Sequence, residues 1–146
     1  MDALIHLKGD LAGTYYPLSN LSEDEARKLR QDHILFEESD KFISSVGGNR
    51  DWPEGRGIYI SDDKKFIVWV NEEDHLKIIS MQPGANFAEV FGRLARGVKE
   101  IDKHLKFTFS DTHGYFSSCP TNLGTGMKAS VHVHLPVLGD HPEHMA

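Results

Sequence analysis

Two apolar runs joined by a short acidic turn constrain the fold of this chain more than any other feature. Residues 66–70 and 76–81 are rich in β-branched and aromatic side chains, and residues 71–75 between them are polar. This composition on both sides of a short polar connection predicts a β-hairpin. Consecutive carboxylates at 72–74 would lie at its tip, and a solvated acidic turn is the simplest interpretation of them.

Two longer helices are predicted from caps and periodicity. Ser22 and Glu25 have the spacing of a capping box, and the apolar residues that follow recur at helical intervals, which predicts a helix over 23–36. Asn86 is expected to cap a second, long amphipathic helix. The apolar face of that helix would comprise Phe87, Val90, Phe91, Leu94, Val98, Ile101 and Leu105.

The remaining pattern mixes short strands, loops and one short helix. Strands are expected near Ile58 and over residues 3–8 and 128–135, and a short helix over 40–46. Residues 9–17 are expected to form a loop. Strands and helices do not alternate regularly, so the order favours an α+β fold, an antiparallel sheet with helices packed on one face.

Composition narrows the class of protein. The chain has 146 residues, 39% of them hydrophobic and 26% charged, which fits a single globular domain over 1–146. A net charge of −6 without a basic stripe argues against nucleic acid. No apolar run reaches the roughly 18 residues that a membrane span needs, and no secretory signal is evident. One cysteine excludes an internal disulfide and suits a reducing compartment, so a cytoplasmic location is expected.

A second stretch carries candidate chemistry. Residues 119–126 join the only cysteine to a loop rich in proline, asparagine and glycine. A lone cysteine is often a small buried hydrophobic residue, and that alternative stays open for Cys119. A polar loop favours instead an accessible thiol.

The two stretches, VWVNEEDHLKIISM and CPTNLGTGMKASVHVHLP, resemble the phosphagen (ATP:guanidino) kinases. The segments GTYYPL, DHILF and RDWPEGRGIY agree with the same family and occur in the same order. The resemblance covers nearly the whole chain. It implies the middle of the family's catalytic domain, which has a glutamine-synthetase-like α+β fold, without the small N-terminal helical domain and without either end of the catalytic domain.

The resemblance also implies an acceptor site. Glu73 matches the carboxylate that holds the guanidinium group and is a candidate base, and Cys119 matches the reactive cysteine that contacts the guanidino group. Thr121 would supply a hydroxyl to the thiolate. A planar carboxylate can pair with two guanidinium N–H groups at once, which suits Glu73 to this role, and Glu72 and Asp74 would then point elsewhere in the turn. The alternative of a solvated turn remains for residues 72–74.

For the nucleotide, the resemblance implies ATP or ADP with Mg2+, but this chain departs from the family at two phosphate-binding positions. Two positions that hold phosphate-binding arginines in the family are Lys77 and Lys128 here, and lysine keeps the charge without the planar fork. The candidate nucleotide site comprises His33, Lys77, Lys128, Ala129, Ser130, Val131 and His132. His33 falls on the apolar face of the predicted helix, so a structural role is an alternative for it.

Two functions follow as expectations. One is a fragment of an ATP:guanidino phosphotransferase, with arginine, lombricine, taurocyamine or creatine as the acceptor. The other is a non-catalytic, truncated member that self-associates, because lost strands leave sheet edges and apolar surface uncovered. A homo-oligomer or strand-swapped dimer is expected, with no nucleic-acid or membrane partner. His134, His141 and His144 are spaced too loosely to predict a metal site.

Overall fold

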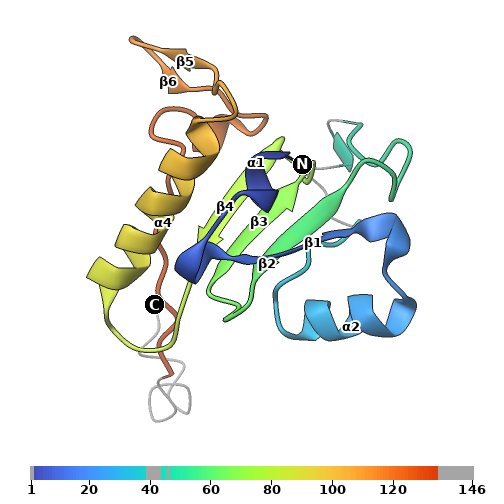
Figure 1. The fold of residues 1–146 in the computed structure, drawn as a ribbon. Helices are drawn as coiled ribbons and strands as arrows, with labels where there is room; N and C mark the ends of the chain where they lie inside the picture. The colour runs from blue at the N-terminus through green and yellow to red at the C-terminus, as the bar shows by residue number, and fades with distance from the viewer. Residues whose placement is uncertain (1, 39–43, 46, 135–146) are drawn as a thin grey trace, which may run out of the picture.

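An antiparallel sheet forms the centre of the computed structural model, which describes residues 2–38, 44–45 and 47–134 (Figure 1). The sheet has four strands in the order β1-β2-β3-β4, each antiparallel to its neighbour. The strands are β1 (Gly13–Pro17), β2 (Gly57–Ser61), β3 (Phe66–Val70) and β4 (Leu76–Ser80). The predicted hairpin and the strand near Ile58 are confirmed, and so is the α+β class.

Helices and short turns surround the sheet. The α-helices are α1 (Asp2–Ile5), α2 (Glu23–Gln31) and α4 (Phe87–Asp102), and the 3-10 turns are η1 (Gly9–Leu11), η2 (Leu18–Asn20) and η3 (Pro120–Asn122). A small separate hairpin, β5 (Phe109–Ser110) and β6 (Gly114–Tyr115), follows α4. Figure 1 shows α4 and this hairpin on one side of the sheet and α2 on the other side of the view.

The strands alternate their side chains between two apolar clusters. Tyr59, Phe66 and Val68 pack with α1, η1 and Ile101 of α4. Ile58 and Ile67 pack on the opposite face with the α2 region. Successive strand residues point to opposite faces, so both faces of these strands are buried. The expectation of helices on one face therefore applies to α1 and α4, whereas α2 covers the other face.

Helix α2 begins as predicted and ends earlier. The Ser22 hydroxyl accepts from the amide of Glu25, and the Glu25 carboxylate accepts from the amide of Ser22. The hydrogen bonds from Ser22 lower the pKa of Glu25. The predicted helix over 23–36 ends at Gln31, because residues 34–36 are all buried and three consecutive residues cannot share one helix face. His33 accordingly leaves the helix with φ 55°.

Helix α4 is confirmed with its Asn86 cap, and Ile101 of the predicted apolar face is buried, but the other fully buried residues were not predicted. The side chain of Asn86 accepts from the amide of Glu89. The buried residues are Arg93, Gly97 and Ile101. Phe87 and Phe91, predicted to be buried, are 59% and 57% exposed. A Cβ on Gly97 would lie 2.3 Å from the Phe66 ring, so glycine is what lets this side of the helix approach the sheet.

Polar contacts of the buried Arg93 hold the same side of α4 against the sheet. Its guanidinium donates to the Ser80 hydroxyl at 3.2 Å and to the Gln82 side chain at 2.5 Å, and pairs with Glu89 at 3.2 Å. Hydrogen-bonding partners on β4 and beyond it make a buried arginine acceptable at a position that apolar periodicity would assign to solvent.

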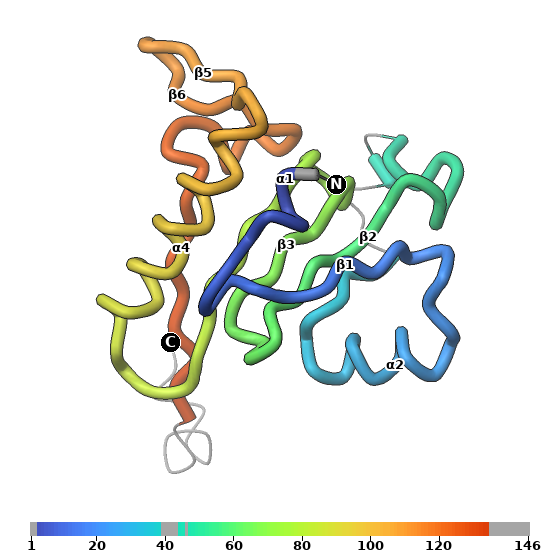
Figure 2. The backbone as a smooth tube through the Cα atoms, in the orientation of Figure 1, coloured from blue at the N-terminus to red at the C-terminus, as the bar shows by residue number. Residues whose placement is uncertain are grey.

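Several other expectations differ from the structure. Residues 3–8 do not form a strand, because α1 occupies 2–5, and residues 13–17 of the expected loop pair with β2 as β1. The described part of the strand expected over 128–135, residues 128–134, is extended and exposed with no strand pairing (Figure 2). The short helix expected over 40–46 falls largely outside the described residues. The β5–β6 hairpin was not foreseen.

Candidate functional site

The tip of the β3–β4 hairpin holds the candidate carboxylates. Asn71 turns the chain with φ 55°, its amide donates to the carbonyl of His75 at 3.0 Å, and its side chain donates to the carbonyl of Gly55 at 2.7 Å. Asparagine tolerates this left-handed conformation better than most residues. The acidic residues that follow Asn71 are therefore presented on an anchored turn rather than on a loose loop.

Glu72 faces inward at this tip. Its side chain is only 5% exposed, and its carboxylate accepts from the amide of Glu73 at 2.8 Å. The Lys77 ammonium lies 3.3 Å from the same carboxylate. Glu72 thus has both a hydrogen-bond donor and a counter-charge, as a buried carboxylate requires.

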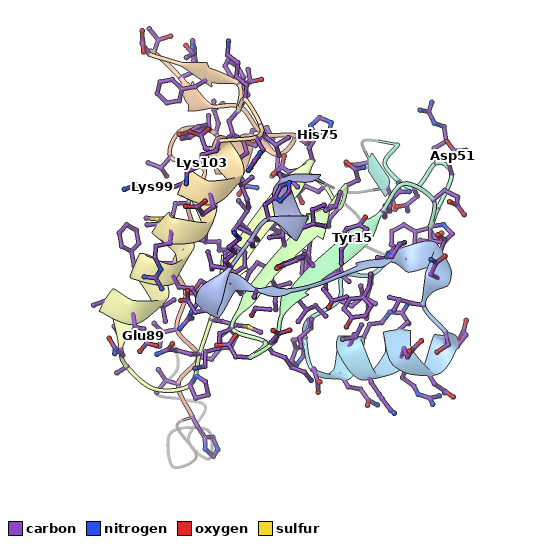
Figure 3. The ribbon with its side chains drawn as sticks, in the orientation of Figure 1. Tyr15, Asp51, His75, Glu89, Lys99 and Lys103 are labelled. Carbon is purple, nitrogen blue, oxygen red and sulfur yellow. The ribbon has the colours of Figure 1, made fainter. Side chains whose placement is uncertain are left out.

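Glu73 and Asp74 face the cysteine loop. The amide of Ser118 donates to Asp74 at 2.5 Å, and the side-chain amide of Asn122 lies 3.3 Å from a Glu73 oxygen and 3.4 Å from an Asp74 oxygen. His75, labelled in Figure 3, marks the end of the sheet where the hairpin tip meets this loop. Residues more than forty positions apart in the sequence are therefore joined at one place.

Cys119 lies on the same loop, immediately before η3. Its sulfur is 2.9 Å from the Thr121 hydroxyl, and its carbonyl accepts from the Ser117 hydroxyl at 2.7 Å. Cys119 is partly exposed rather than a fully buried core residue. Glu73, Cys119 and Thr121, the residues proposed for the acceptor site, thus belong to two loops that hydrogen-bond to each other.

The candidate nucleotide residues are not brought together in this way. His33 is exposed just beyond α2, and Lys77 lies on β4 beside Glu72. Lys128, Ala129, Ser130, Val131 and His132 are exposed on the extended segment after the cysteine loop. Within the described residues, no hydrogen bond or ion pair joins that segment to His33 or Lys77.

The arrangement of the donor side chains determines whether the chain itself could hold Mg2+ or another metal ion. The described residues contain no group of three or more histidine, cysteine or acidic side chains arranged to hold a metal ion. His134 is exposed, and His141 and His144 lie outside the described residues. The described side chains therefore do not fit a direct metal site.

Three contacts of the candidate site are not predicted by the sequence analysis. Asp74 was expected to point elsewhere in the turn, and Asn122 and Ser118 were given no role, yet these residues make the bonds between the two loops. The sequence contains one signal for these contacts, which is the presence of Asn122 in a loop rich in proline and glycine. An asparagine side chain can donate to a carboxylate while the backbone of its own turn remains satisfied.

Comparisons with known proteins identify the family to which this chain belongs. Residues 1–145 match the family model described as "ATP:guanido phosphotransferase, C-terminal catalytic domain". An arginine kinase of Anthopleura japonica is 56% identical over 96% of this chain, and arginine kinase Oct f 2 of Amphioctopus fangsiao is 51% identical over 94%. The solved structure of the duplicated taurocyamine kinase from Schistosoma mansoni, with bound transition state analog components, is 49% identical and aligns over 99% of the chain with a TM-score of 0.92.

The fold and the matched residues define a phosphagen kinase catalytic domain. The chain belongs to the ATP:guanido phosphotransferase family, in the part described as the C-terminal catalytic domain. It spans 20% of the Anthopleura relative, 40% of the Amphioctopus relative and 20% of the aligned Schistosoma chain. Within the part of the chain that the structure describes, every helix is too short or too polar to span a bilayer.

Proposed function

We propose that this chain supplies the guanidino-acceptor side of an ATP:guanidino phosphotransferase. The observation that carries the proposal is Glu73, a half-buried carboxylate that is oriented by Asn122 and is paired with no cation among the described residues. Each carboxylate oxygen has two lone pairs, so the bond from Asn122 leaves capacity for a bidentate guanidinium. The loop that carries Cys119 lies against the same turn.

The proposed chemistry is phosphoryl transfer from ATP to a guanidino nitrogen. Glu73 would hold the cation in line with the terminal phosphate and accept the proton of the attacking nitrogen, so that the N–P bond forms as the bond from phosphorus to the leaving ADP oxygen breaks. A thiolate at Cys119, accepting from Thr121, would add a second negative group near the guanidinium. Arginine, lombricine, taurocyamine and creatine are the acceptors considered.

ATP with Mg2+, bound by His33 and residues 128–132, is the nucleotide part of the proposal, whereas Lys77, which the resemblance also assigns to the nucleotide, is paired with Glu72. Mg2+ would be held by the nucleotide phosphates, since the described residues contain no metal-binding cluster. The sole cysteine must stay reduced for this chemistry, so a cytoplasmic location belongs to the same proposal. Residues 1–146 would form one partial catalytic domain.

The test of the proposal is a coupled assay with Mg-ATP and a panel of guanidines, run on a chain extended to the length of its relatives. Glu73→Gln should lower kcat by about 10²–10⁴-fold and leave ATP affinity nearly unchanged, because only the acceptor loses its base and counter-ion. Glu23→Gln, at an exposed position on α2, is the matched control. An unchanged kcat in Glu73→Gln would refute the assignment.

The alternative is a non-catalytic, self-associating member of the family. Its support is the unpaired outer edge of β4 among the described residues, the unpaired segment 128–134, and the exposed Phe87 and Phe91. The 146-residue chain should then sediment as a dimer or larger, bind Mg-ATP at millimolar or weaker concentration, and show no turnover. A monomer that binds Mg-ATP at micromolar concentration would exclude this alternative.

A further inference from the structure

The ammonium of Lys77 occupies a seat formed by the Trp69 ring of β3 and the Glu72 carboxylate of the hairpin turn. It lies 4.9 Å from the centre of the Trp69 ring and 3.3 Å from the Glu72 carboxylate. Trp69 and Lys77 are direct partners in the β3–β4 register, so strand pairing alone brings the cation over the ring. An ammonium over an indole face is attracted by the ring quadrupole.

Contacts with Ile34 and Phe36 fix the Trp69 ring. The Trp69 indole donates to the carbonyl of Ile34 at 2.6 Å, and its ring packs against Phe36 with centroids 5.3 Å apart. Ile34 and Phe36 are buried in the second apolar cluster. The ring is therefore fixed, so Lys77, whose side chain is 46% exposed, would lose the cation–π contact if it swung away.

The buried Glu72 carboxylate favours a Lys77 ammonium that remains beside it. The Glu72 side chain is 5% exposed, and Lys77 is its only ion-pair partner among the described residues. Removing the counter-charge from a buried carboxylate is strongly unfavourable. Lysine carries its charge on one ammonium without the planar fork of a guanidinium, so a Lys77 ammonium held by Glu72 is less able to bind a phosphate at the same time.

We propose that Lys77 is a positioning residue for the acceptor carboxylate, and that it is not primarily a phosphate ligand. Lys77 fixes Glu72, Glu72 accepts from the backbone amide of Glu73, and that bond sets the direction in which the Glu73 side chain leaves the turn. The inference rests on the proposed role of Glu73. It reverses the assignment of Lys77 to the nucleotide and leaves Lys128 as the phosphate-facing lysine.

The test uses the 146-residue chain without any guanidine, so its outcome is independent of whether turnover occurs. Amide hydrogen exchange at Glu73 is measured by NMR in Lys77→Met, Lys77→Arg and Lys128→Met. Lys77→Met should speed exchange at Glu73 by about tenfold, and Lys77→Arg should restore it to within about twofold. Lys128→Met, a matched loss of one exposed lysine, should leave it unchanged. Exchange at Tyr59, in the core, reports global folding.

A second measurement covers the case in which Lys77→Met fails to fold. Glu72→Gln releases Lys77 from its counter-ion, so affinity for inorganic tripolyphosphate should rise several-fold, while Lys128→Met should lower it. Unchanged Glu73 exchange in a folded Lys77→Met variant would overturn the proposal. Weaker tripolyphosphate binding in Glu72→Gln, or a change in Trp69 emission on titration of tripolyphosphate into a Trp52→Phe chain, would overturn it as well. Failure of the proposed function would appear separately, as normal Glu73 exchange responses with no activity in the extended chain.

Discussion

The side-chain amide of Asn122 lies 3.3 Å from a carboxylate oxygen of Glu73, across 49 positions of sequence. The same amide lies 3.4 Å from Asp74, whose other oxygen accepts from the amide of Ser118 next to Cys119. The hairpin tip and the cysteine loop are therefore one unit. Their relative placement depends on Asp74 and Asn122 as well as on Glu73, the residue proposed to hold the substrate.

Asp74→Ala should loosen the contact between the hairpin tip and the cysteine loop. The variant removes the acceptor of the Ser118 amide, a hydrogen bond to a charged group worth roughly 1.5–3 kcal/mol, so exchange of that amide should rise by about ten- to hundred-fold. Amide exchange by NMR measures this directly. Asp111→Ala, at the exposed turn of β5–β6, is the control. Equal exchange in wild type and Asp74→Ala would show that other contacts hold the loop.

Thr121 should raise the reactivity of Cys119. A hydroxyl 2.9 Å from the sulfur can donate to the thiolate, which is the nucleophilic form. Cys119 should therefore react with iodoacetamide at pH 7 faster than free cysteine, and Thr121→Val should slow the reaction several-fold. Thr125→Val, in the same loop and without a contact to the sulfur, is the control. Labelling no faster than free cysteine would return Cys119 to a structural role.

Gly97→Ala and Gly92→Ala should have opposite effects on stability, although both glycines lie in α4. A Cβ at Gly97 meets the Phe66 ring at 2.3 Å, whereas a Cβ at Gly92 meets only the end of the Arg96 side chain at 3.4 Å. Gly97→Ala should destabilise by about 1–3 kcal/mol through overpacking, and Gly92→Ala should stabilise by up to about 1 kcal/mol through helix propensity. Urea denaturation of both variants measures the difference, and equal stabilities would contradict the close contact.

Asp63 should make stability fall in acid. Burial favours its protonated form, but hydrogen bonds from the Lys65 amide and the Ser61 hydroxyl, together with nearby Lys65 and Arg93, hold its pKa below the ordinary value of 3.8. A lowered folded-state pKa stabilises the protein above pH 3.8, and this contribution is lost as the pH falls through the folded-state pKa.

The corresponding measurement compares wild type with Asp63→Asn by urea denaturation across pH. Asparagine keeps an acceptor oxygen without the charge, so at pH 7 the variant should lose less than about 1 kcal/mol, because the carboxylate is partly exposed. The difference should shrink below pH 3.8. A difference that stays constant down to the acid transition would attribute the effect to packing rather than to charge.

Local patterns predicted the hairpin and the starts of the helices. The β-branched runs around residues 71–75 and the caps at Ser22 and Asn86 act over a few positions, and all were confirmed. The family resemblance was confirmed as well. Each of these depends on short-range chemistry or on the identity of residues in order, which a sequence displays directly.

Tertiary packing decided the features that the sequence could not determine. Helix α2 stops at Gln31 because Ile34, Leu35 and Phe36 are all buried, and α4 presents Arg93 and Gly97 to the sheet because a ring at Phe66 and acceptors on β4 lie there. The seat of Lys77 between Trp69 and Glu72 exists only once β3 and β4 are in register. The sequence by itself determined the residue types of the site and their local turns. Only the folded chain decided which of them meet, because contacts such as Asn122 with Glu73 join segments whose separation along the chain carries no local signal.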